Sequence, residues 1–87
     1  MDYTKYLIAF IMLGETGNSF VVINQTKKQM ECLKLTATGN ENIVIPKKTF
    51  KKMLHDSQIE LVNKLPNDVF SDIKTTWHNN IALQATI

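Results

Sequence analysis

Apolar runs separated by short polar segments fill the first half of the chain. Residues 5–13 are almost continuously apolar, and Ser19–Gln25 is rich in the β-branched and aromatic residues typical of a strand. The glycine- and asparagine-rich stretch 14–18 between them has the composition of a hairpin loop. We therefore expect 5–13 to be a strand covered on both faces, although Asp2 and Gly14 would also suit the two ends of a helix.

Two further strands are predicted before the chain reaches Pro46. Residues 29–37 alternate in polarity, though neither face is purely apolar, and 43–45 is a short β-branched run. The lysine pair at 27–28 and the turn-forming residues at 38–42 separate these elements. The first half of the chain therefore predicts an antiparallel meander of three to four strands.

The second half has the spacing of short helices. Pro46 suits the start of a helix at 47–55, because its missing N–H is not needed in a first turn. Ser57 and Glu60 match a capping box, which predicts a second helix that Pro66 ends.

A third helix is predicted to begin at Asn67 and to end at Asn79-Asn80. Its apolar residues recur at helical spacing, and they are Val69, Phe70, Ile73 and Trp77. Alternation over 81–87 favours a final strand. The predicted fold is α+β in a single domain over 1–87, with the sheet at about 5–45, a segment of about three short helices at 46–80 and the last strand at 81–87.

Size and composition restrict the class of protein. The 87 residues suit one domain with a modest core, and 44% hydrophobic and 21% charged residues are ordinary for a globular chain. The single cysteine, Cys32, cannot form an internal disulfide, which favours a reducing, cytoplasmic location. The longest apolar run is too short to span a bilayer, and no signal-peptide cleavage site follows it. A core this small would gain from a homodimer interface.

Catalytic and metal-binding patterns are weak. Ser57 stands two residues from His55, which does not place both on one helix face, and a capping role explains Ser57 better. Cys32, His55 and His78 show none of the short spacings of metal sites. The three glycines form no nucleotide-binding loop. We therefore expect no enzymatic activity, no cofactor and no metal.

The helix predicted at 47–55 carries the most specific signal. At 100° per residue its cationic side chains fall within one arc of roughly 140°; they are Lys47, Lys48, Lys51, Lys52 and His55. Phe50, Met53 and Leu54 fall on the other side. Lys27 and Lys28, in a predicted loop, could extend the basic face. Such a face indicates an anionic partner, although a lysine-rich helix face is also often only a solvated surface.

Nucleic acid is the first class of partner that fits. The chain has ten lysines and no arginine, and lysine contacts phosphates as a point charge without the bidentate reading of bases that arginine provides. This predicts binding of DNA or RNA through the backbone, single-stranded or sequence-tolerant. The net charge of +2 is low for such a protein.

Aromatic residues and a second helical motif could add to this function. Tyr3, Tyr6, Phe10 and Phe20 would stack on single-stranded bases if they were exposed, although the two phenylalanines are better explained as core. The second and third predicted helices have roughly the lengths of a helix-turn-helix. Asp68 and Asp72 would then face phosphates, which argues against that motif.

The second class is a protein-binding module. A basic helix docks on an acidic protein surface as readily as on DNA. The alternative function is therefore an adaptor or inhibitor that uses the same lysine face against an acidic partner. Small accessory proteins of phages and mobile elements are of this general kind.

Overall fold

The computed structural model describes residues 1–11 and 17–85. Within them, five antiparallel strands form one sheet in the order β4-β3-β2-β1-β5. The strands are β1 (Tyr6–Phe10), β2 (Ser19–Gln25), β3 (Gln29–Thr36), β4 (Gly39–Pro46) and β5 (Ile59–Lys64). The first four form the predicted meander, and β5 returns to pair with the outer edge of β1.

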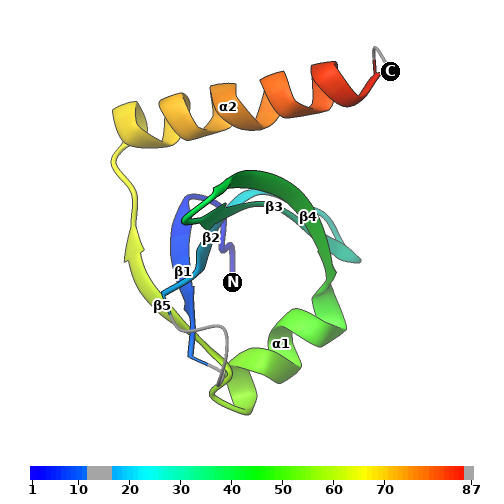
Figure 1. The fold of residues 1–87 in the computed structure, drawn as a ribbon. Coiled ribbons are helices and arrows are strands. Elements are labelled where there is room, and N and C mark those ends of the chain that lie inside the picture. The colour runs from blue at the N-terminus through cyan, green and yellow to red at the C-terminus, as the bar shows by residue number, and fades with distance from the viewer. Residues whose placement is uncertain (12–16, 86–87) are drawn as a thin grey trace.

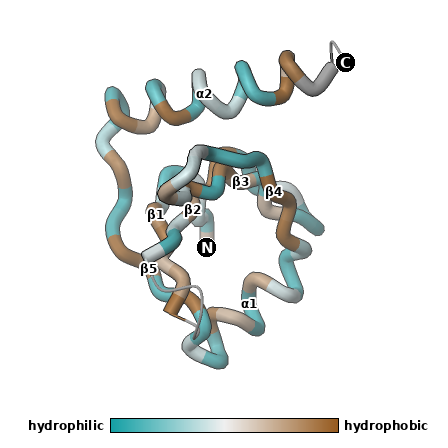
Figure 2. The backbone as a smooth tube through the Cα atoms, in the orientation of Figure 1, coloured by the Kyte–Doolittle hydropathy of each residue, from teal (hydrophilic) through white to brown (hydrophobic). Residues whose placement is uncertain are grey.

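Two helices cover opposite faces of this sheet (Figure 1). They are α1 (Lys47–His55) and α2 (Asn67–Ala85). The sheet is strongly curved, and α1 bridges its two edge strands, β4 and β5. Hydrophilic and hydrophobic positions alternate along both helices, as in amphipathic helices (Figure 2). The fold class is thus α+β with an antiparallel sheet, as the sequence predicts.

The sheet is apolar on both faces, which explains the unbroken apolar runs. Along β2, Phe20 and Val22 pack into the cluster beneath α1, whereas Val21 and Ile23 pack into the cluster beneath α2. All four side chains are buried. The prediction of a strand covered on both faces is confirmed for Tyr6–Phe10. Residues 12–16 of the predicted strand and hairpin loop lie outside the described part of the chain.

Phe50 attaches α1 to the sheet. Its side chain is fully buried, and its ring packs edge-on against Tyr3 and Phe20, with centroids 4.9 and 6.4 Å away. Met53 and Leu54 are half-buried against the same cluster. Removing a buried phenylalanine side chain typically costs about 3–5 kcal/mol. Phe50 therefore determines which side of α1 faces the core and leaves the opposite side to solvent.

The predicted helix between Ser57 and Pro66 is wrong, because this segment forms β5. Ser57 has a left-handed backbone (φ 58°) and does not start a helix. Instead it follows the end of α1, where the N–H of Ser57 donates to Leu54 O and that of Gln58 to Met53 O. This is the Schellman arrangement of a helix C-terminus. The capping-box spacing of Ser57 and Glu60 is thus coincidental. Ile59–Lys64 instead pairs with β1 and satisfies the hydrogen-bonding groups of the backbone at its edge.

The turn predicted at 38–42 is shorter than expected. β4 begins at Gly39, and Thr36 Oγ1 donates to the Gly39 carbonyl oxygen over 2.6 Å across a tight hairpin. Gly39 has φ +144°, which a side chain would disfavour. Polar residues such as Asn40 and Glu41 fit in β4 because it is an edge strand with much of its surface in solvent.

The last helix begins at Asn67 as predicted but does not end at Asn79-Asn80. It continues to Ala85, so the strand predicted at 81–87 is wrong for 81–85, and residues 86–87 lie outside the described part. Each asparagine in a helix interior costs less than about 1 kcal/mol relative to alanine. Two asparagines are therefore not enough to end a helix of this length. Ile81 stands one turn beyond Trp77 and prolongs the apolar side of the helix.

Candidate functional site

The outward side of α1 is cationic. Lys48, Lys51, Lys52 and His55 are exposed, and Lys47 is half-buried. Phe50 and its neighbours hold the other side of the helix against the sheet. The two sides are therefore divided as the helical spacing predicts, and the lysines are available to a partner.

The turn between β2 and β3 lies beside the start of this helix. The N–H of Lys47 donates to the carbonyl oxygen of Lys28 over 2.8 Å, and Gln29 pairs with Pro46 in the sheet. Thr26 shapes the turn, since its Oγ1 accepts from the N–H groups of Gln29 (3.0 Å) and Lys28 (3.3 Å). The turn that carries Lys27 and Lys28 is thus held beside the start of α1 by the pairing of β3 with β4.

We call this surface the lysine strip. It consists of Lys27 and Lys28 in the turn and of Lys47, Lys48, Lys51 and Lys52 on α1. It holds six of the ten lysines of the chain. The rest of the chain has four lysines and all eight acidic residues, so the +2 net charge conceals a strongly uneven distribution.

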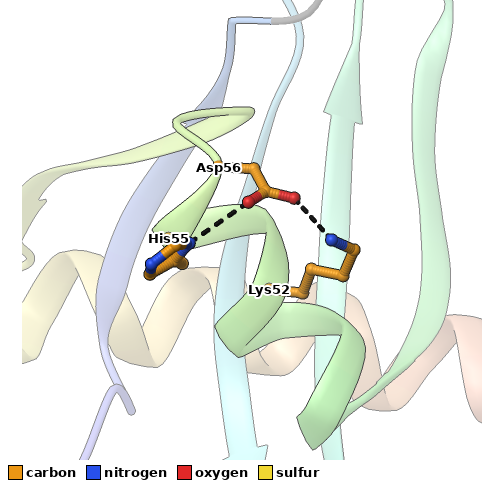
Figure 3. A network of polar contacts seen from close by, with 3 residues as sticks. All are labelled: Lys52, His55 and Asp56. Atoms are coloured by element: carbon orange, nitrogen blue, oxygen red, sulfur yellow. Dashed lines mark hydrogen bonds and ion pairs between the residues drawn. The ribbon is translucent and has the colours of Figure 1, made fainter.

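Asp56, directly after α1, offsets part of this charge (Figure 3). Lys52 Nζ lies 2.8 Å from Asp56 Oδ2, and His55 Nδ1 lies 3.2 Å from Oδ1. The hydrogen bonds from Lys52 and then His55 lower the pKa of the Asp56 carboxyl, and the same partner raises the pKa of Lys52. Among the residues that the structure describes, the other five lysines of the strip have no ion pair. Sequence reasoning did not single out Asp56, although its i,i+4 spacing from Lys52 is a usable signal.

The residues in the first turn of α1 destabilise the helix. Lys47 and Lys48 stand in the first turn, where the helix dipole is positive, and no acidic residue is present there. Pro46, at the N-cap position, provides no side-chain hydrogen bond. Cations at this end typically cost 0.3–1 kcal/mol each. The first turn of α1 therefore lacks the favourable interaction with the helix dipole that acidic residues would provide.

The aromatic residues pack in the two hydrophobic clusters rather than among the lysines of the strip. Phe10 and Phe20 are buried, as expected, and Tyr3 and Tyr6 are half-buried against the same cluster. Trp77 packs beneath α2, on the opposite face of the sheet. The aromatic side chains of the sheet are therefore part of the core rather than a surface for stacking bases.

The helix-turn-helix interpretation is wrong, since the first of its two helices is the strand β5. Asp68 and Asp72 lie on α2, across the sheet from the strip.

The other chemistry-bearing residues that the structure describes are not gathered into a site. Burial raises the pKa of the Cys32 thiol to about 12, with a smaller effect from Glu31, so the thiol is neutral at pH 7. His78 lies on α2, and its ring packs edge-on against Trp77 with centroids 5.0 Å apart. Within residues 1–11 and 17–85, no group of three or more potential metal ligands occurs. No helix in these ranges is long and apolar enough to cross a bilayer.

Comparison with protein-family models, curated proteins and solved structures gave no significant match to this chain.

Proposed function

We propose that this protein is a small, non-enzymatic nucleic-acid-binding domain that contacts the phosphate backbone through the lysine strip. The observation that carries the proposal is the junction of two basic segments distant in sequence. The turn at Lys27-Lys28 is hydrogen-bonded to the first residue of α1, so the lysines of the turn and those of the helix belong to neighbouring segments. Phosphate contacts depend on such a concentration of cations.

The chemistry of lysine determines how this binding works. An ammonium group donates to phosphate oxygens from many directions, and it lacks the planar fork with which arginine reads guanine. With no arginine in the chain, the strip is expected to bind many sequences about equally. The two lysines in the first turn of α1 support the proposal further, because an anion there would relieve their conflict with the helix dipole.

The salt dependence of binding gives the expected magnitude. Four to six phosphate contacts would give a slope of log K against log salt of about −4 to −5 on a duplex. Affinity would then fall about 10²- to 10³-fold between 50 and 200 mM salt. Fluorescence anisotropy with labelled oligonucleotides would measure this slope directly.

Two charge-matched double variants test the assignment of the surface. Lys48→Glu/Lys51→Glu reverses two charges in the strip, whereas Lys64→Glu/Lys74→Glu makes the same change on β5 and α2. The strip variant is expected to lose more than about tenfold in affinity at 100 mM salt, because two phosphate contacts disappear. The control variant is expected to stay within about threefold of the wild type, since only long-range screening applies.

Two results would contradict the proposal. One is the absence of binding to any oligonucleotide at low salt, which would favour the docking of the strip on an acidic protein. The other is an equal loss in both double variants, which would indicate attraction by net charge rather than by this surface. Circular dichroism of each variant would establish that the fold is intact.

A further inference from the structure

All seven aromatic residues of the chain pack in the two hydrophobic clusters, away from the lysine strip. Phe10, Phe20 and Phe50 are buried beneath α1, where Tyr3 and Tyr6 pack against them. Phe70 and Trp77 belong to the cluster on the α2 side. Stacking on aromatic side chains typically supplies about 1–3 kcal/mol per base in single-strand binding. The strip cannot supply this contribution.

The lysines on α1 form two rows rather than one. Lys47 and Lys51 lie about 40° apart around the helix axis, and Lys48 and Lys52 form a second such row about 100° away from the first. Around a helix 10–12 Å in diameter, rows at this angle are roughly 8 Å or more apart at the side-chain surface. The grooves of B-DNA are about 6 and 12 Å wide. Two rows at this separation can therefore contact phosphates on both sides of a groove.

Charge density favours the same ligand. α1 has nine residues and is about 13 Å long. Over that length a duplex presents about eight phosphates, whereas one strand presents about four. A rigid strip without stacking residues gains affinity only from phosphates, so the ligand with more phosphates within reach binds more tightly.

We propose that the ligand of the lysine strip is double-stranded nucleic acid, contacted across a groove, rather than a single strand. This inference rests on the proposed function, since it assigns the class of nucleic acid that the same surface takes. The two strands are held by different rows: Lys47 and Lys51 contact one backbone, and Lys48 and Lys52 contact the other. Lys27 and Lys28 continue the contact beyond the first turn of α1.

The test compares a 20-base-pair DNA duplex of mixed sequence with an unstructured thymine 20-mer. Affinities for the wild-type protein are measured by anisotropy from 25 to 200 mM salt. We expect the duplex to bind at least about tenfold more tightly at 100 mM salt, with the steeper salt slope. We also expect the emission of the tyrosines and of Trp77 to stay unchanged on binding, because none of these rings contacts a base.

Row-specific variants test the groove geometry. Lys47→Gln/Lys51→Gln and Lys48→Gln/Lys52→Gln each remove one row, and each is expected to reduce the duplex salt slope by about two. Lys64→Gln/Lys74→Gln, with the same change in charge, is the matched control and should leave the slope unchanged. If one row carries the whole slope, the contact across a groove is wrong.

The remaining outcomes separate the two proposals. A thymine 20-mer that binds as tightly as the duplex, or that quenches tyrosine emission, overturns the assignment of a duplex ligand and leaves the proposed function in place. Failure of both oligonucleotides to bind at 25 mM salt overturns the proposed function, and the assignment of a duplex with it.

Discussion

The backbone N–H of Lys47 donates to the carbonyl oxygen of Lys28 over 2.8 Å, which connects the β2–β3 turn to the first residue of α1. The position of the turn lysines therefore depends on the turn itself. Thr26 Oγ1 accepts from two N–H groups of that turn, at Lys28 and Gln29. A change at Thr26 can thus move cations without removing any.

Thr26→Val is the first test of this connection. Valine has nearly the same shape as threonine, and it leaves the two N–H groups without their acceptor. We expect nucleic-acid affinity to fall about two- to fivefold, since loss of a turn hydrogen bond costs about 1 kcal/mol and loosens the turn. Thr26→Ser keeps the hydroxyl and should bind like the wild type. Anisotropy at 100 mM salt measures both, and equal affinities for all three proteins would show that the turn does not position the strip.

Lys48→Glu should change stability and binding in opposite directions. A carboxylate in the first turn of α1 interacts favourably with the helix dipole, so we expect the free energy of unfolding to rise by about 0.3–1 kcal/mol. Binding to DNA should weaken at the same time, because the strip loses a contact and gains a repulsive charge. Urea denaturation and anisotropy on the same sample measure the two effects. A decrease in stability would mean that Lys48 contributes to the fold.

Asp56→Asn should strengthen binding. Asp56 lies 2.8 Å from Lys52 and competes with a ligand for that cation, and its own charge repels phosphates. Asparagine keeps the size of the side chain and removes the charge. We expect affinity at low salt to rise several-fold, because the carboxylate no longer competes with phosphate for Lys52, and the salt slope to stay close to that of the wild type. Asp72→Asn, on α2, makes the same change in net charge and is the control. An equal gain in both variants would attribute the effect to net charge alone.

Much of this architecture follows from sequence pattern, and the errors have physical causes. β2 is predictable from its β-branched and aromatic composition, and α1 from the helical spacing of its apolar and basic residues. Ile59–Lys64 is mistaken for a helix because Ser57 and Glu60 have capping-box spacing, while the decisive factor is the unpaired edge of β1, which no local pattern reveals. Polar residues hide the first half of β4 for a related reason, since an edge strand needs few apolar side chains.

The candidate site divides in the same way. The basic side of α1 is predictable from helical spacing, because it depends only on local geometry. The junction with Lys28 depends on the pairing of β3 with β4, so only the folded sheet brings the turn to the helix. The packing of the two half-buried tyrosines beneath α1 likewise depends on which face of the sheet the helix covers.

Cys32 should make the protein sensitive to alkaline pH. Burial raises the pKa of its thiol to about 12, whereas an exposed cysteine in the unfolded chain titrates near 8.5–9. The folded state therefore retains a proton that the unfolded state loses. The stability associated with the neutral thiol is complete below about pH 9 and decreases by about 1.4 kcal/mol per pH unit as the pH rises toward 12.

The comparison with Cys32→Ala isolates this effect from the other groups that titrate at high pH. Wild type should be the more stable protein at pH 7–8, because alanine leaves a small cavity in a fully buried position. The difference should shrink above pH 9 in urea denaturation. A constant difference from pH 8 to 11 would contradict a shifted thiol. Iodoacetamide at pH 8 should modify the native protein only as fast as it unfolds.

Ser57→Gly distinguishes the two interpretations of Ser57 by the sign of its effect. In the structure Ser57 has φ 58° and occupies the position after α1 that glycine usually fills. Glycine relieves the left-handed strain of roughly 1–2 kcal/mol and adds about 0.5–1 kcal/mol of unfolded-state entropy. We therefore expect a net gain of about 0.5 kcal/mol, or about 2–4 °C in Tm. A helix N-cap would instead lose a few tenths of a kcal/mol with glycine and about 1 kcal/mol with alanine. Ser57→Ala keeps the β-carbon, and its Tm should stay close to that of the wild type. A clear loss of Tm in both variants would support Ser57 as a helix N-cap and contradict its position after the C-terminus of α1.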